Sequence, residues 1–174
     1  MSICLHNGTL LSGFSVMENC AVLIEDGKIS DVFSQKRFEQ KKFPPSVRVV
    51  DVEGAYIAPG FIDTHIHGFA GHGTDNCSVD SMIAMSEDLA QYGVTSFNPT
   101  LYPADEETMI SSIKAVVKAM GKERGAKIMG LHLEGPFISP DKLGVQRPET
   151  VKTVDINLMD RLWAASEGHI VNMT

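Results

Sequence analysis

Two histidines spaced two residues apart, His65 and His67, are the side chains of this sequence best suited to chemistry. They end the mainly apolar run of residues 59–68, and in a strand the side chains at i and i+2 point to one face. Two imidazoles at one strand end can bind a divalent cation. Asp63 shares their face and can orient one ring by accepting its other N–H. The spacing alone fits equally well two exposed histidines at a polar strand end, because His-x-His pairs also arise by chance.

A carboxylate candidate, Glu134, ends a later apolar stretch at residues 127–134. Alternation along that stretch places Gly130, His132 and Glu134 on one face. Imidazole and carboxylate ligands together are typical of hydrolytic zinc and iron sites, where the metal acidifies a water molecule and polarises a carbonyl. His132 lies one pleat deeper than Glu134, so we expect it to support the ligands without binding the metal. A lone glutamate at a strand end is usually a capping or salt-bridge residue, and the preceding His-x-His strand is what favours a metal site here.

The elements that must position these residues alternate between strand and helix from residue 56 onward. After the histidine strand we expect strands at residues 94–98, 127–134 and from 169, and helices at residues 78–92, 105–120 and 155–166. Pro99 is predicted to close the second strand. This alternation indicates a parallel α/β arrangement, in which sites form at the C-terminal ends of the strands. Because a (β/α)8 barrel takes ~250 residues, about half of one would be present, and we expect a truncated chain that stops within its fourth strand.

Residues 1–55 read as a small β module without visible chemistry. Asp26 and Gly27 separate two apolar runs and predict a tight hairpin between residues 21 and 33. Asn7 and Gly8 predict a turn between two short strands, and residues 47–52 predict a further strand. The polar residues 35–46 are expected to form a surface connection.

Composition is that of an ordinary soluble globular protein: 174 residues, 43% hydrophobic and 21% charged. A net charge of −7 argues against nucleic acid or an anionic membrane as the main partner. No run approaches the ~18 apolar residues of a membrane span, and no secretory signal is visible at the N-terminus. Three scattered cysteines without a Cys-x-x-Cys motif indicate reduced thiols, so we expect a cytoplasmic protein.

Residues 49–68, which include Pro-Gly-x-x-Asp-x-His-x-His, resemble the opening signature of the amidohydrolase superfamily. Residues 92–100 and the run Gly-Leu-His-Leu-Glu-Gly-Pro-Phe at 130–137 are similar to segments of the N-acetylglucosamine-6-phosphate deacetylase family. The resemblance covers the whole chain in the same order. It implies a (β/α)8 TIM-like barrel whose first half is residues 56–174. It also implies that residues 1–55 are the N-terminal part of a β-sandwich domain.

The resemblance further implies a metal-dependent hydrolase of amino-sugar catabolism that deacetylates N-acetylglucosamine 6-phosphate to glucosamine 6-phosphate and acetate. Glu134 matches the family's metal-ligand glutamate, and His65 and His67 match a pair that binds a second metal in some members. One or two divalent ions, zinc or iron, are therefore expected. Val145 and Gln146 match a substrate-contacting turn, with Gln146 in place of a histidine. The resemblance also implies a homodimer, with the remaining ligands and a general-base aspartate beyond Thr174.

Three alternatives stay open at this point. The substrate can be N-acetylgalactosamine 6-phosphate. It can also be a cyclic amide, although the Leu-Glu-Gly-Pro run argues against this because those relatives usually bridge their metals with a modified lysine. If the natural chain ends at residue 174, a catalytically inactive half-barrel that acts as a binding module is expected instead.

Overall fold

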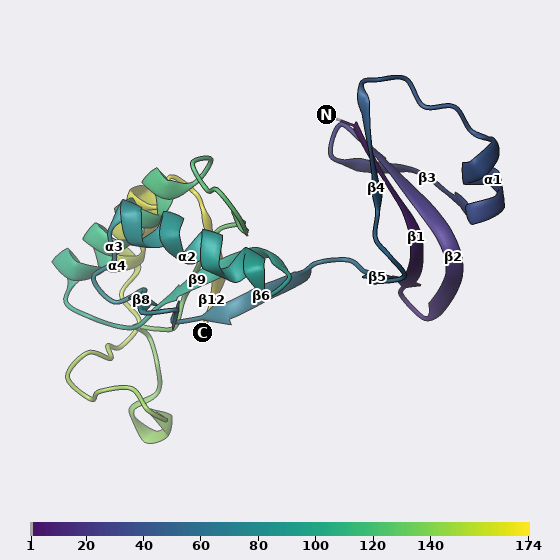
Figure 1. The fold of residues 1–174 in the computed structure, drawn as a ribbon. Helices are drawn as coiled ribbons and strands as arrows, with labels where there is room; N and C mark the ends of the chain where they lie inside the picture. The colour runs from purple at the N-terminus through teal and green to yellow at the C-terminus, as the bar shows by residue number, and fades with distance from the viewer. Residues whose placement is uncertain (1) are drawn as a thin grey trace. The chain divides into compact units, whose positions relative to one another are not determined.

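The computed structural model describes residues 2–174 and divides into two compact units, Met1–Pro59 and Gly60–Thr174 (Figure 1). We call these the first and second units. The boundary falls after Pro59 and not after residue 55 as predicted. The reason is that β5 (Tyr56–Ile57) pairs in parallel with β1 (Ser2–Ser12) and so belongs to the first sheet. Within residues 2–174, no helix has the length and apolar character needed to cross a membrane.

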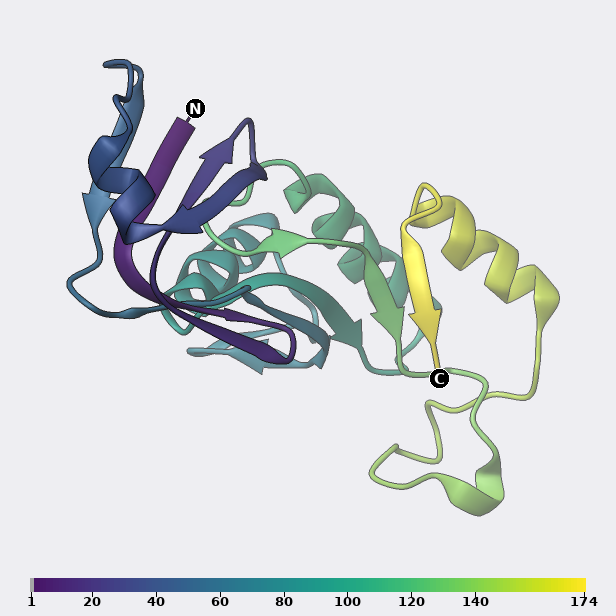
Figure 2. The same ribbon diagram turned by 90° about the vertical axis from the view of Figure 1, so that its right-hand side faces the viewer.

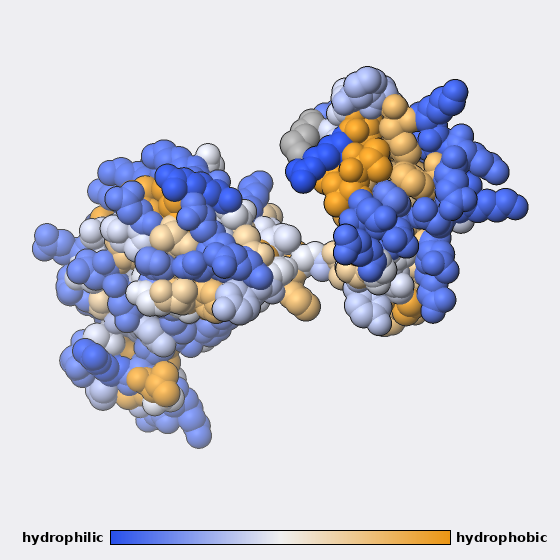
Figure 3. All heavy atoms as spheres, viewed as in Figure 1, coloured by the Kyte–Doolittle hydropathy of each residue, from blue (hydrophilic) through white to orange (hydrophobic). Residues whose placement is uncertain are grey.

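The first unit is a five-stranded sheet in the order β3-β2-β1-β4, with β5 also paired to β1. Its other strands are β2 (Ser15–Glu25), β3 (Lys28–Ser34) and β4 (Val47–Asp51). The predicted hairpin is confirmed: Asp26 and Gly27 have φ angles of 49° and 75°, and they join the antiparallel strands β2 and β3. Apolar side chains gather on the face of this unit that is turned to the viewer in Figure 3.

One expectation for the first unit is wrong, and another is met by a segment that includes a helix. The predicted turn at Asn7 and Gly8 is an irregularity inside one continuous strand, because Asn7 takes a φ of 60° and the register with β2 shifts between Leu5 and Gly8. The expected surface connection begins with a short helix, α1 (Gln35–Gln40), whose N-cap Ser34 accepts a hydrogen bond from the backbone N–H of Arg37.

The second unit is a parallel sheet whose strands lie side by side in chain order. They are β6 (Phe61–Ile66), β9 (Val94–Leu101), the pair β10 (Lys127–Ile128) and β11 (Leu131–Leu133), and β12 (Ile170–Met173). Strand β9 pairs with β6 and with β10 and β11, and β12 pairs with β11. Helices α2 (Val79–Gln91), α3 (Glu106–Ala119) and α4 (Ile156–Ala165) lie next to one another on one face of this sheet (Figures 1 and 2). The C-terminal ends of the strands therefore share one edge.

The core of this unit lies between the sheet and the three helices. Its larger buried members are apolar and come from each helix and from the strands: Met82, Met85, Leu89, Phe97, Leu101, Met109, Ile113, Val116, Ile128, Leu131, Leu133, Leu158 and Leu162. The helix starts are confirmed where the sequence placed them. Ser78 forms a capping box with Ser81, and Asp105 and Asp155 accept from the backbone N–H groups of their first turns.

Two strand predictions in the second unit need correction. Strand β9 does not close at Pro99 but runs on to Leu101. Pro99 is in register with Ile66 of β6 on one side, and on the other side it lies between the residues that pair with β10 and those that pair with β11. Residues 127–134 form two short strands. The backbone between them approaches β12 so closely that a Cβ at Gly130 would lie 2.8 Å from the carbonyl oxygen of His169.

The hairpin of β7 (Gly68–Phe69) and β8 (His72–Gly73) follows directly after β6. Between β11 and α4 a long loop contains one short 3-10 helix, Pro140–Lys142. This loop and the hairpin both lie at the C-terminal edge of the sheet, where the predicted ligands also fall.

Candidate metal centre

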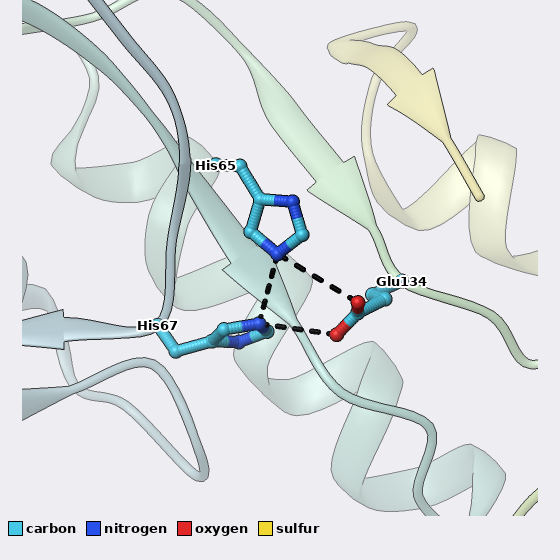
Figure 4. A group of neighbouring side chains, drawn as sticks. All are labelled: His65, His67 and Glu134. Atoms are coloured by element: carbon cyan, nitrogen blue, oxygen red, sulfur yellow. Dashed lines mark hydrogen bonds and ion pairs between the residues drawn. The ribbon is translucent and has the colours of Figure 1, made fainter. Parts of the chain in front are cut away.

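The structure brings together the three predicted metal ligands, His65, His67 and Glu134 (Figure 4). The Nε2 atoms of the two histidines are 3.1 Å apart. His67 Nε2 is 3.1 Å from Oε2 of Glu134, and His65 Nε2 is 3.7 Å from Oε1. His65 belongs to β6, His67 follows the end of that strand, and Glu134 follows the end of β11. Three donor atoms from two strand ends thus point to one spot.

The orientation of His67 is set by the neighbouring strand β9. Its Nδ1 lies 3.1 Å from the carbonyl oxygen of Thr100. A carbonyl only accepts, so we assign the proton to Nδ1, which leaves the lone pair of Nε2 directed at the cluster. The fully buried Thr74 lies with its hydroxyl 2.6 Å from the same carbonyl and 3.0 Å from the carbonyl of His67. A histidine whose other nitrogen is bound in this way is typical of a metal ligand.

The donor set fits a divalent cation. With Nδ1 protonated, Nε2 of His67 and Oε2 of Glu134 are two acceptors only 3.1 Å apart, so a proton or a cation is needed between them. Gln146 donates its side-chain N–H to the same Oε2 at 2.9 Å, which holds the carboxylate in place. Imidazole nitrogens with a carboxylate suit zinc or iron. The two histidines and Glu134 are therefore the residues that would hold the ion.

Asp63 does not have the contact that the sequence predicted. Its carboxylate accepts the backbone N–H of His65 at 3.1 Å and not a ring N–H. The physical reason is a register irregularity between Asp63 and Ile66, which leaves the amide of His65 free for a side-chain partner. Asp63 therefore fixes the backbone beneath the first histidine.

His132 lies almost fully buried beside the cluster and outside the group of three ligand atoms. Its ring meets that of His65 edge to face, with centroids 4.7 Å apart. Nδ1 is 3.1 Å from the hydroxyl of Thr100 and Nε2 is 2.8 Å from the hydroxyl of Thr174. Burial, and next the nearby His65, lower the pKa of His132, so the ring is neutral near pH 7. A neutral ring bound at both nitrogens supports His65 without needing a metal itself.

A cavity of about 520 Å³ opens beside the cluster. Gln146 lines it and also contacts Glu134, so this side chain connects the cavity to the ligands. Val145 lines it too, although its own side chain is largely exposed. The other polar lining residues include Asp75, Asp105 and Arg147.

Sequence reasoning missed Tyr102, which stacks on His67 with ring centroids 3.6 Å apart and planes 3° apart. Burial, and next the charge of Glu134, raise the pKa of Tyr102, so the phenol stays protonated at neutral pH. The missed signal is the length of β9. A strand that continues past Pro99 to Leu101 places residue 102 at the edge that carries the ligands.

Residues 56–173 match the sequence model of the amidohydrolase family, and the chain belongs to that family. It is 31% identical over 163 residues to N-acetylglucosamine-6-phosphate deacetylase of Haemophilus influenzae, which covers 93% of this chain and 41% of the relative. It is 30% identical over 176 residues to the Bacillus subtilis protein of the same name, which covers 99% of this chain and 43% of the relative. The chain thus spans less than half the length of these relatives.

A solved structure with the same fold is that of N-acetylglucosamine-6-phosphate deacetylase from Pasteurella multocida. It matches with a TM-score of 0.84 at 24% identity, over 99% of this chain and 44% of that one. The predicted parallel α/β class is confirmed by this likeness and by the pairing of β6, β9, β11 and β12.

Proposed function

We propose that the protein to which this chain belongs hydrolyses N-acetylglucosamine 6-phosphate to glucosamine 6-phosphate and acetate. The observation that carries the proposal is the convergence of His65, His67 and Glu134 at the C-terminal edge of a parallel sheet. The names of the Haemophilus influenzae and Bacillus subtilis relatives support this substrate. In the reaction one water adds to the acetamide carbonyl, the C–N bond breaks, and the amine leaves with a proton.

The cation is proposed to be zinc or iron, as one or two ions, bound by Glu134 and by the histidine pair. When bound, it would acidify a water molecule and polarise the acetamide carbonyl. The chain's own residues prepare that site. Thr100 fixes the tautomer of His67, and Gln146 fixes the carboxylate of Glu134. A general-base aspartate and further ligands are proposed to lie in sequence beyond Thr174, because the chain spans less than half the length of its relatives.

The second unit is proposed to be the first half of a (β/α)8 barrel, and the first unit part of a β-sandwich domain. The cavity that Val145 and Gln146 line has the size of a small-molecule site, and we propose that it takes part of the phosphorylated amino sugar. Its wall contains charged groups of both signs, Asp75, Asp105 and Arg147, which suits a polar ligand. The homodimer and the cytoplasmic location remain predictions, and mass measurement of the native protein in solution tests the first.

Release of acetate from N-acetylglucosamine 6-phosphate by the full-length protein tests the proposed activity. We expect turnover that dialysis against a chelator abolishes and that added Zn²⁺ or Fe²⁺ restores. Glu134→Gln should lower the rate more than the about 10- to 100-fold that loss of a residue supporting a metal ligand costs. Glu39→Gln, an exposed position on α1, is the matched control and should leave the rate unchanged.

N-acetylgalactosamine 6-phosphate is the comparison substrate in the same assay. Faster turnover of this epimer would replace the proposed substrate while keeping the chemistry. Full activity after chelation would refute a metal-dependent reaction. Absence of acetate release from either sugar, with metal bound, would refute the proposed activity and leave the metal site standing.

A further inference from the structure

We infer that Tyr102 is a positioning residue that holds His67 in the orientation required for metal binding. The inference rests on the metal site of the proposed function, and it concerns a residue outside the three ligands. Tyr102 follows directly on the last residue of β9 and lines the cavity beside the cluster.

The end of β9 holds the imidazole of His67 on two sides. Thr100, on β9, accepts the Nδ1 proton at the edge of the ring, and Tyr102 covers one face. A hydrogen bond at one edge leaves the ring free to tilt about that bond. A parallel ring 3.6 Å away removes this freedom, so Nε2 points only toward His65 and Glu134. The two contacts together fix both the tautomer and the plane of the ligand.

The stacking geometry also favours an electron-poor imidazole. Two ordinary aromatic rings prefer offset or edge-to-face contacts over a face-to-face sandwich with near-complete overlap. The centroids here are 3.6 Å apart with planes 3° apart, which leaves little room for an offset. The electron-rich face of a phenol attracts positive charge, and an imidazole that shares its lone pair with a cation carries part of that charge. Tyr102 therefore stabilises His67 in its metal-bound form more than in its free form.

Zinc binding to metal-depleted, full-length protein tests this inference by calorimetry, without any assay of turnover. His67→Ala identifies the binding event that depends on this histidine. Tyr102→Leu should weaken that event by about 10- to 100-fold, the range seen when a contact that orients a ligand is lost. Tyr102→Phe keeps the ring and should bind zinc as the wild type does. Tyr56→Leu is the matched control, since it removes an exposed tyrosine of the first unit.

Wild-type zinc affinity in Tyr102→Leu would overturn the inference. If that variant does not fold, the ring protons of His67 in the wild-type NMR spectrum decide. The stacked phenol should shift them upfield, and Tyr102→Phe should preserve the shift. Unshifted ring protons would overturn the inference by themselves. Neither result depends on acetate release, so failure of the proposed activity can be told apart from failure of this inference.

Discussion

Each unit of the chain contains a histidine stacked on an aromatic ring, and only one of the two stacks belongs to a site. In the first unit, His6 lies on Phe38 with centroids 4.0 Å apart and planes 14° apart. In the second, His67 lies on Tyr102. The Nδ1 atom of His6 is buried and has no hydrogen-bond partner within residues 2–174, whereas Nδ1 of His67 is bound to Thr100 and Nε2 faces Glu134. Stacking covers the face of a histidine ring, but hydrogen bonds at the ring nitrogens are what fix the direction in which the ring points.

The difference follows from the kind of sheet on which each histidine lies. In the first sheet, β2 is antiparallel to both β1 and β3, and β4 and β5 are parallel to β1, so the C-terminal ends of its strands are divided between two edges. The second sheet is parallel, so its strand ends share an edge, and residues 33 positions apart, such as His67 and Thr100, meet there. If this comparison is right, changes at the C-terminal edge of the second sheet should weaken metal binding, and matched changes in the first unit should not.

Shortening the buried side chain of Leu133, next to Glu134, should have the largest effect on stability. Leu133 is fully buried and directly precedes Glu134, so Leu133→Ala should lower the free energy of unfolding by about 2–5 kcal/mol. We also expect weaker zinc binding, because the backbone of Glu134, held by the carbonyl of Leu101, can relax into the space left behind. Urea unfolding followed by Trp163 fluorescence measures the first effect in the second unit, and calorimetry measures the second.

Leu23→Ala is the matched change in the first unit, where Leu23 is also buried. It should lower the free energy of unfolding by a similar amount, measured by circular dichroism, and leave the zinc affinity unchanged. Equal losses of zinc affinity in the two variants would contradict the contrast between the units.

Loss of the hydrogen bond from Gln146 to Glu134 should have a smaller effect, which is confined to zinc affinity. Gln146→Leu removes the donor to Oε2 of Glu134, so the carboxylate gains freedom and zinc affinity should fall by about 10- to 100-fold. Gln35→Leu is a control of the same chemistry in the first unit, since Gln35 accepts the backbone N–H of Asn7. Calorimetric titration with zinc should separate the two variants. A Gln146→Leu protein with wild-type affinity would show that this hydrogen bond does not orient the ligand.

The sequence was sufficient for features that depend on neighbouring residues. Ser78, Asp105 and Asp155 mark helix starts because an N-cap involves only a residue and the next three positions. The grouping of His65, His67 and Glu134 was also predictable, because two histidines at one strand end and a glutamate at another converge once the sheet is parallel.

Features that depend on contacts between residues far apart in the chain could not be predicted from the sequence. Thr74 and Tyr102 act on His67 only because β9 and the hairpin after β6 meet at one edge. The predicted end of β9 at Pro99 hid this, because a proline usually closes a strand, whereas β9 runs on to Leu101 with Pro99 in register with Ile66 of β6. Likewise, Asp63 accepts a backbone N–H because the register between β6 and β9 is irregular at this point, and residue spacing along the sequence does not predict such an irregularity.

The smallest effect expected is on the pH dependence of stability, through two cysteines. It tests whether burial shifts the pKa of a thiol in the same direction in both units. Burial raises the pKa of the Cys77 thiol to about 11 in the second unit, and burial also raises the pKa of Cys4 in the first unit, where the nearby Lys41 opposes the rise. A folded-state pKa above the unfolded value, about 8.5, means that the folded protein holds the proton longer. The stabilising contribution of Cys77 is therefore complete below that pH and is lost as pH rises toward about 11.

Urea unfolding of the wild type and of Cys77→Ala at pH 8 and at pH 10 measures this contribution. The wild type should lose more stability than the variant between the two pH values, and the Cys77 thiol should react slowly with an alkylating reagent at pH 8. The same comparison with Cys4→Ala should show a decline of the same sign, because both thiols are removed from water. Parallel pH profiles for the wild type and Cys77→Ala would show that the thiol ionises as freely in the folded protein as in the unfolded chain. The contact between the Cys77 thiol and the carbonyl oxygen of Ser112 would then be open to water.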